Sequence, residues 1–168
     1  MHIVLVEPEI PQNTGNIART CSVTGCELHL VHPLGFSTEN KYLKRAGLDY
    51  WDMLDIFHYD SLDEVLNRFP ESNVYYTSTK AQKGYHQVTY TKNDLLVFGK
   101  ETAGLSETLL TEKYDHCIRI PMINEARSLN LSNSVAIVLF EALRQTGFNE
   151  FKIKGELPAK NGGKINED

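Results

Sequence analysis

The sequence predicts an α/β protein in which a mainly parallel sheet carries helices on both faces. Short apolar runs typical of buried strands alternate along the chain with longer segments of helical periodicity. Such alternation favours parallel strands, because their connections are long enough to hold a helix. The chain has 168 residues, 41% hydrophobic and 23% charged. These values match globular proteins and exclude disordered, collagen-like and disulfide-scaffold chains.

The first strand is expected at residues 3–6, an apolar run that ends at Glu7 and Pro8. A helix over 14–23 follows it, with Asn13 or Thr14 as the capping residue. This segment therefore forms the first strand-to-helix connection of the α/β pattern.

The next strand is expected at residues 28–31, Leu-His-Leu-Val. Residues 40–46 and 61–68 have helical patterns, and Ser61 and Glu64 have the spacing of a capping box. The first half of the chain thus supplies two strands and three helices.

The second half contains three further β-rich runs, at 74–77, 95–98 and 117–120. A short helix is expected at 106–110, between the last two of these strands. The last strand is stopped by Pro121, because proline cannot donate a hydrogen bond to a neighbouring strand.

The last helix is expected over 132–146, ended by Gly147. Apolar residues cover most of its circumference, and an all-round apolar helix must be buried. In so small a domain, a second copy of the chain could bury part of that surface. We expect residues 1–155 to form one domain and 156–168 to be a flexible C-terminal tail.

Charge and cysteine content suggest where the protein works. Seventeen Lys and Arg against 22 Asp and Glu give a formal net charge of −5, so an RNA partner would need a local basic patch. The three cysteines form no C-x-x-C pair and favour a reduced, cytoplasmic protein. Neither a membrane span nor a signal peptide is expected.

Several familiar site patterns are missing from the sequence. Residues 99–104 have the two glycines of a P-loop but lack its Lys-Ser/Thr, and neither G-x-G-x-x-G nor G-x-S-x-G occurs. His29 and His32 are three apart on a predicted strand and would point to opposite faces, so we expect no shared metal site.

Three polar segments lie at the ends of predicted strands, where open α/β sheets bind ligands. They are residues 11–20, 96–105 and 118–134. Each segment could also have a purely structural role: the first as a capped helix, the second as a tight turn and the third as a long capping loop. In the third segment, Ser and Asn residues exceed what a cap needs, which favours contacts to backbone or ligand.

These segments, in this order and spacing, resemble the motifs of the SPOUT superfamily of RNA methyltransferases. The sequence is most similar to its small single-domain branch, which methylates the ribose 2′-oxygen of cytidine or uridine at the tRNA wobble position. The similarity spans residues 2–151 and rests on 7–11, 45–50 and 127–133.

The resemblance implies a C-terminal deep trefoil knot, a homodimer with the site near its interface, and S-adenosylmethionine as cofactor. No metal is required, because the cofactor brings its own electrophile. The residues at matching cofactor-binding positions are Thr77, Gly99, Ile120, Ser128, Leu129 and Asn133.

The resemblance also assigns Arg19 a catalytic role, with Asn13 as a weaker candidate that orients it. Arginine is effectively always protonated. Holding the 2′-hydroxyl or an adjacent phosphate is therefore easier for Arg19 than acting as a general base.

Basic residues interleaved with aromatic ones are candidates for contacts to the tRNA anticodon stem-loop. They are Lys41, Lys44, Arg45, Lys152 and Lys154. Each could equally belong to a solvated face. Two alternatives to the methyltransferase stay open here: a catalytically inactive RNA- or nucleotide-binding dimer of the same fold, and a cofactor-binding protein with a small-molecule substrate.

Overall fold

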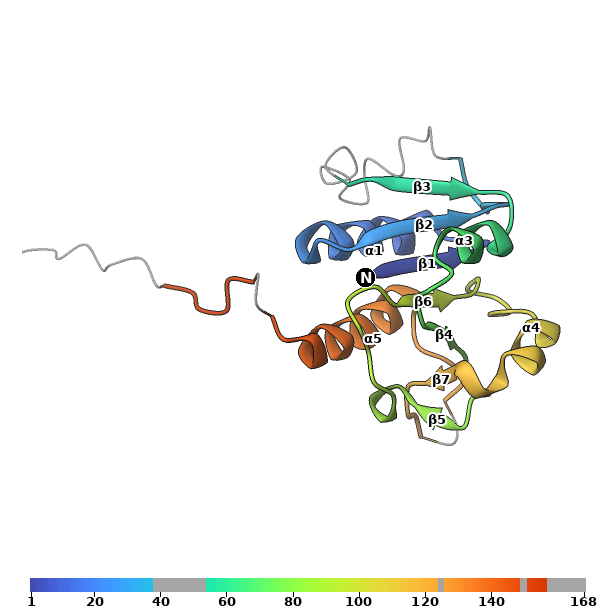
Figure 1. Cartoon of the computed structure of the whole chain (residues 1–168). Coiled ribbons are helices and arrows are strands. Elements are labelled where there is room, and N and C mark those ends of the chain that lie inside the picture. The colour runs from blue at the N-terminus through green and yellow to red at the C-terminus, as the bar shows by residue number, and fades with distance from the viewer. Residues whose placement is uncertain (38–53, 124–125, 149–150, 157–168) are drawn as a thin grey trace, which may run out of the picture.

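The structure is a computed structural model of the chain, and it describes residues 1–37, 54–123, 126–148 and 151–156. Its centre is one sheet of seven parallel strands in the order β3-β2-β1-β6-β4-β7-β5 (Figure 1). The strands are β1 (His2–Val6), β2 (Glu27–Val31), β3 (Ile56–Tyr59), β4 (Val74–Thr77), β5 (Lys83–Gly84), β6 (Leu95–Phe98) and β7 (Cys117–Arg119).

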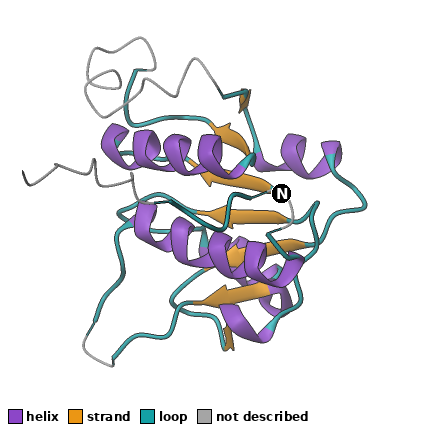
Figure 2. Ribbon diagram, turned by 90° about the vertical axis from the view of Figure 1, so that its left-hand side faces the viewer, coloured by secondary structure: helices purple, strands orange, loops and turns teal. Residues whose placement is uncertain are grey.

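Helices cover both faces of this sheet, as the sequence predicts. The long helices α1 (Pro11–Thr24) and α5 (Leu131–Thr146) contact each other and lie side by side on one face (Figure 2). The shorter α3 (Leu62–Arg68) and α4 (Glu107–Glu112) pack on the other face through Val65 and Leu110. Two 3₁₀ turns, η2 (Tyr85–Gln87) and η3 (Tyr114–His116), lie in the connections.

The apolar core divides into two layers because successive strand residues point to opposite faces. In β1, Ile3 and Leu5 pack with α1 and α5, whereas Val4 packs with α3 and α4. Leu5 lies in register between Leu30 of β2 and Phe98 of β6, all three buried. The central strands β1, β2 and β6 are thus buried on both faces, which explains their continuous apolar runs.

The predicted elements are confirmed in kind, with shifted bounds. The helix expected over 14–23 begins earlier, at Pro11, and its N-cap is Ile10, which makes no side-chain capping bond. Proline suits a first helical position because its missing N–H would be unpaired there. The short strands β3 and β5 were not predicted, and the helix expected over 40–46 lies outside the described residues.

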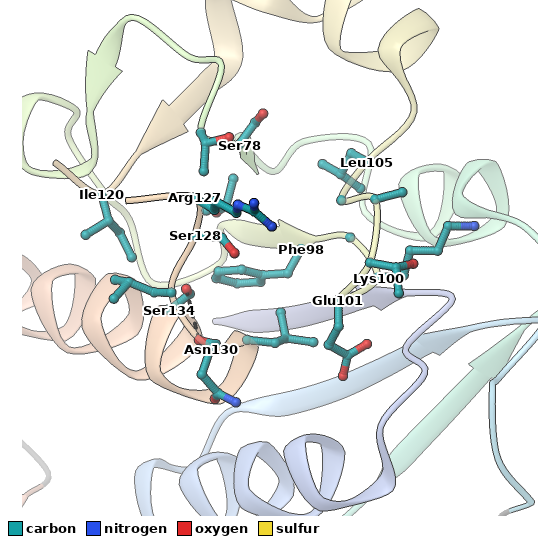
Figure 3. Close-up of a pocket in the computed structure, with 18 of the residues that line it drawn as sticks. Ser78, Phe98, Lys100, Glu101, Leu105, Ile120, Arg127, Ser128, Asn130 and Ser134 are labelled. Carbon is teal, nitrogen blue, oxygen red and sulfur yellow. Dashed lines mark hydrogen bonds between the residues drawn. The ribbon is translucent and has the colours of Figure 1, made fainter. Parts of the chain in front are cut away.

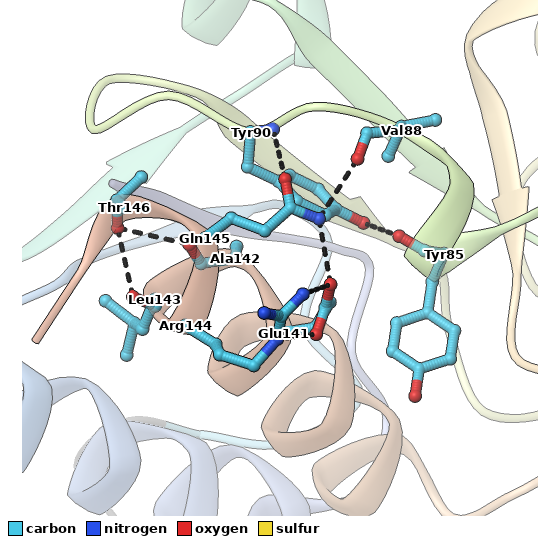
Figure 4. Close-up of polar contacts among 9 residues, drawn as sticks. All are labelled: Tyr85, Val88, Tyr90, Glu141, Ala142, Leu143, Arg144, Gln145 and Thr146. Carbon is cyan, nitrogen blue, oxygen red and sulfur yellow. Dashed lines mark hydrogen bonds and ion pairs between the residues drawn. The ribbon is translucent and has the colours of Figure 1, made fainter.

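The C-terminal part of α5 is tied to the segment between β5 and β6 (Figure 4). The Gln145 side chain accepts a hydrogen bond from the Tyr90 amide at 3.1 Å and donates one to the Val88 carbonyl at 3.1 Å. The Tyr90 hydroxyl donates to the Tyr85 carbonyl at 2.6 Å. The helix α5 therefore contacts both β6 and this segment.

One stripe of α5 stays exposed although the helix is apolar all round. Ile137 and Phe140 are 36% and 45% exposed, whereas Val135, Val138 and Leu139 are fully buried. The single chain therefore does not bury the whole helix, whereas the all-round apolar pattern predicts a buried one. None of the helices among the described residues is both long and apolar enough to cross a membrane.

Candidate functional site

A pocket of about 530 Å³ lies at the carboxyl ends of β4, β6 and β7, beside the loop that follows β1 (Figure 3). Its walls come from the loops after these strands and from the start of α5. The volume lies in the range of small-molecule and cofactor sites. The pocket is where the three polar segments of the sequence meet.

Five of the six predicted cofactor residues line this pocket: Thr77, Gly99, Ile120, Ser128 and Leu129. The sixth, Asn133, is exposed in the first turn of α5 and is not among the lining residues. Among the described residues, the buried Thr77 hydroxyl has no hydrogen-bond partner. An unpaired buried hydroxyl in a pocket wall fits a ligand that carries polar groups.

Gly99 lies where the loop after β6 folds back on itself. A Cβ added there would lie 2.1 Å from the carbonyl carbon of Gly104 and 2.2 Å from the amide nitrogen of Leu105. The turn is closed by a 2.8 Å hydrogen bond from the Gly104 amide to the Lys100 carbonyl. A side chain at position 99 would therefore open the loop first, before it reached any ligand.

The carboxylate of Glu101 holds the start of α1. It accepts hydrogen bonds from the backbone amides of Glu9 at 2.8 Å and Ile10 at 3.2 Å, and from Asn13 Nδ2 at 2.9 Å. An acidic group suits the positive end of the helix dipole. Glu101, 91 residues from Ile10 in sequence, thus replaces the local cap expected from Asn13 or Thr14.

Asn13 connects α1 to α5 through Asn130. Asn130 Nδ2 donates to Asn13 Oδ1 at 2.9 Å, while Asn130 Oδ1 caps α5 by accepting from the amides of Ser132 at 2.9 Å and Asn133 at 3.3 Å. Both ends of the Asn13 amide are therefore engaged by pocket loops. These contacts show that Asn13 links the loop after β6 to the start of α5, while its expected role in orienting Arg19 stays a prediction.

Two more contacts lock the loop after β1 to the loop after β6. The Glu9 carboxylate accepts from the amide and the hydroxyl of Thr102, each at 3.0 Å. Lys100 Nζ pairs with Glu7 Oε2 at 2.7 Å, and this hydrogen bond raises the pKa of Lys100. Several interactions thus fix one wall of the pocket.

The pocket wall carries three cations, and two are paired. Lys80 pairs with Glu107, whose pKa is lowered by that hydrogen bond, and Lys100 pairs with Glu7. Arg127 is exposed and has no hydrogen bond or ion pair within the part of the chain that the structure describes. Its guanidinium points into the pocket (Figure 3).

Of the predicted catalytic and RNA-binding residues that the structure describes, only Asn13 lines the pocket. Arg19 is exposed on α1 and does not line the pocket of its own chain. Lys152 and Lys154 follow α5, whose 16 residues span roughly 24 Å from the pocket end, so they lie far from it. Lys41, Lys44 and Arg45 fall outside the described residues.

A second polar cluster occupies the opposite edge of the sheet. The fully buried His29 is linked through Nδ1 to the Tyr59 hydroxyl at 3.1 Å and through Nε2 to His2 Nδ1 at 3.2 Å. Glu27 Oε2 lies 3.2 Å from His2 Nδ1 and 3.4 Å from His29 Nε2, so the three groups also present potential cation ligands. His32 pairs instead with His58, in agreement with the expected separation from His29.

Glu101 and Asn130 lie in the polar segments 96–105 and 118–134, but neither is among the predicted site residues. Their signal is in the sequence: an acid in a glycine-flanked loop directly after a buried strand, and an Asn before an apolar helix. Their partners, however, lie about 90 and 117 residues away. No local pattern could pair them.

Comparisons with known proteins identify the family of this chain. The sequence matches the SpoU rRNA Methylase family over residues 1–140. A relative from Yersinia pestis, named tRNA (cytidine(34)-2′-O)-methyltransferase, is 47% identical over 154 residues, covering 88% of this chain and 95% of its own. One from Saccharophagus degradans with the same name is 45% identical over 148 residues, covering 88% and 96%.

Solved structures of RNA methyltransferases have a similar fold. One described as "Structural insights into the 2-OH methylation of C/U34 on tRNA" has a TM-score of 0.81 and 41% identity, over 86% of this chain and 94% of that one. AviRb from Streptomyces viridochromogenes, in complex with AdoMet, has a TM-score of 0.75 and 26% identity, over 86% and 57%. The chain belongs to the SpoU methylase family.

Proposed function

We propose that this protein transfers the methyl group of S-adenosylmethionine to the ribose 2′-hydroxyl of cytidine or uridine at position 34 of tRNA. The names of its close relatives support this activity. The observation that carries the proposal is the pocket at the carboxyl ends of β4, β6 and β7, lined by five of the residues expected to hold the cofactor.

The residues of the pocket fit this cofactor. Ile120, Leu105 and Leu129 offer apolar surface for the adenine, and the unpaired Thr77 hydroxyl offers a polar contact. When bound, S-adenosylmethionine supplies an electrophilic methyl group on a sulfonium, so the protein needs no electrophile of its own.

The protein must then hold the 2′-hydroxyl in line with that methyl group and let its proton leave. We assign the first task to Arg19, whose guanidinium can hold the hydroxyl or a neighbouring phosphate with several donors. Asn13, Glu101 and Asn130 keep α1 at a fixed distance from the pocket loops. They act as positioning residues.

We also propose that the working form is a homodimer in which Arg19 serves the pocket of the second copy. Two observations support this arrangement: Arg19 does not line its own pocket, and Ile137 and Phe140 leave an apolar stripe exposed on α5. Phe140→Glu should give a monomer in sedimentation experiments at micromolar concentration. A Phe140→Glu dimer would contradict this interface.

We also propose that the C-terminal part of the chain forms a deep trefoil knot. The contacts of α5 both with β6 and with the segment between β5 and β6 support it. The three buried free cysteines, Cys21, Cys26 and Cys117, support a cytoplasmic location, where thiols stay reduced.

The activity is tested with purified protein, labelled S-adenosylmethionine and unmodified tRNA, followed by mass spectrometry of the nucleosides. We expect one methyl group on the ribose of nucleotide 34, and none when that nucleotide carries a 2′-deoxyribose. Methylation elsewhere, or of the deoxy substrate, would contradict the proposal. An inactive RNA-binding protein would bind tRNA and transfer nothing. Loss of the same modified nucleoside from a deletion strain provides the matching cellular test.

Sharing of the site between two copies is tested by complementation. Arg19→Ala removes the catalytic residue, and Ser128→Trp fills the pocket at an exposed position. Each variant alone should be inactive. A co-expressed mixed dimer has one intact site if Arg19 acts across the interface, so it should regain about half of the wild-type rate per dimer. A mixed dimer without activity would place Arg19 in its own chain's site.

A further inference from the structure

Three cationic side chains line the pocket, and among the described residues Arg127 alone of the three has no counterion. Lys80 and Lys100 each have a carboxylate partner on the protein, Glu107 and Glu7. Arg127 lies on the same wall and, within the described ranges, no carboxylate or carbonyl pairs with it. A paired lysine is a poor donor for a ligand, because binding would first break the existing pair.

The position of Arg127 is that of a ligand-binding side chain. It directly precedes Ser128 and Leu129, which line the same pocket. Its guanidinium points into the pocket between Ser78 and Ser128, while the backbone around it stays exposed (Figure 3). An arginine has five donors in a planar fork that matches a carboxylate.

Among the described residues, the carboxylates nearest the pocket already have partners. Glu101 accepts from Glu9, Ile10 and Asn13, and Glu9 accepts from Thr102. Within the described ranges no carboxylate is left for Arg127, which favours an anion that comes with a ligand.

We propose that Arg127 forms an anion-binding subsite of this pocket, and that its ligand is the carboxylate of the methionyl part of S-adenosylmethionine. This inference rests on the proposed cofactor. The carboxylate is favoured over a tRNA phosphate because the two residues that follow Arg127, Ser128 and Leu129, both line the cofactor pocket.

The test compares two ligands that differ only in the carboxylate. Calorimetry measures binding of S-adenosylhomocysteine and of its decarboxylated analogue, S-adenosyl-3-thiopropylamine, to wild type and Arg127→Gln. In the variant, affinity for S-adenosylhomocysteine should fall roughly 10-fold, the low end for a lost charge-assisted hydrogen bond because the group is exposed. Affinity for the analogue should not change.

Two further variants control the comparison. Lys80→Gln removes a pocket cation that already pairs with Glu107, so it should leave both affinities unchanged. Arg127→Lys keeps the charge without the planar fork and should restore only part of the lost affinity. Arg127 is exposed and makes no hydrogen bond or ion pair within the described residues, so the melting temperature of Arg127→Gln should equal that of wild type.

Three results would overturn the inference. An unchanged affinity for S-adenosylhomocysteine would show that Arg127 does not contact it. An equal loss for both ligands would mean that Arg127 shapes the pocket instead of binding the carboxylate. A raised KM for tRNA with unchanged cofactor binding would assign Arg127 to an RNA phosphate. If wild type binds neither ligand, the cofactor assignment itself fails, which is a separate result.

Discussion

Replacing Gly99 with alanine should damage the pocket through its loop. The new Cβ would lie 2.1 Å from the carbonyl carbon of Gly104, 2.5 Å from its oxygen and 2.2 Å from the Leu105 amide nitrogen. Carbon atoms pack at roughly 3.5–4 Å, so the two backbone segments must separate by about 1 Å or more. The neighbouring atoms are backbone, which cannot rotate away as a flexible side chain can.

The cost follows from this displacement. Overpacking of a close contact destabilises by about 1–3 kcal/mol, and each kcal/mol lowers Tm by roughly 2–4 °C in a protein of this size. We therefore expect a Tm lower by roughly 2–12 °C. The same movement shifts Glu101 and Thr102, which hold the loop after β1. Affinity for S-adenosylhomocysteine should consequently fall by about 10-fold or more.

Scanning calorimetry and titration calorimetry on one preparation measure both effects. Gly104→Ala is the matched control: it lies in the same loop at φ +71°, where a Cβ would meet nothing within 4 Å. Its cost should be only the left-handed backbone penalty, about 1–2 kcal/mol, with little change in affinity. Gly99→Ala with wild-type Tm and affinity would refute this account of the loop. Gly99→Val should behave as a stronger form of the alanine variant.

Three further predictions concern catalysis, the loop contacts and pH. Arg19→Ala should leave affinity for S-adenosylhomocysteine within a few-fold but lower methyl transfer roughly 100-fold, and Arg19→Lys should restore little of the lost activity. If Arg19→Ala keeps near-normal turnover at saturating tRNA, Arg19 has no catalytic role. Glu101→Gln weakens the charge-assisted bonds to Glu9 and Asn13 and should cost about 1–2 kcal/mol in urea unfolding; an unchanged midpoint would show that this contact does not stabilise the fold. Burial lowers the pKa of His29 from its usual 6.5 to about 3, so the unfolded chain takes up a proton at a higher pH than the folded chain. The free energy of unfolding should therefore be full above about pH 6.5 and should decline as the pH falls toward 3. His29→Gln should flatten that decline.

The sequence alone determined the fold class and the place of the site. Apolar runs such as residues 95–98 are buried on both faces of a parallel sheet, so their pattern is local and visible. The polar segments after the strands predicted the pocket because strand ends in a parallel sheet share one edge. The family resemblance implied Thr77, Gly99 and Ser128 as cofactor-binding positions, and all three line the pocket.

Tertiary structure decided how the site is held together. A helix N-terminus usually finds its cap within a few residues, yet α1 takes its acceptor from Glu101, because spatial proximity across the sheet replaces sequence proximity. Asn130 links two helices for the same reason. The need for glycine at position 99 also arises from a backbone contact between loop residues rather than from a ligand. Which cation remains available to a ligand depended on which lysines found carboxylates, and only the folded chain could pair them.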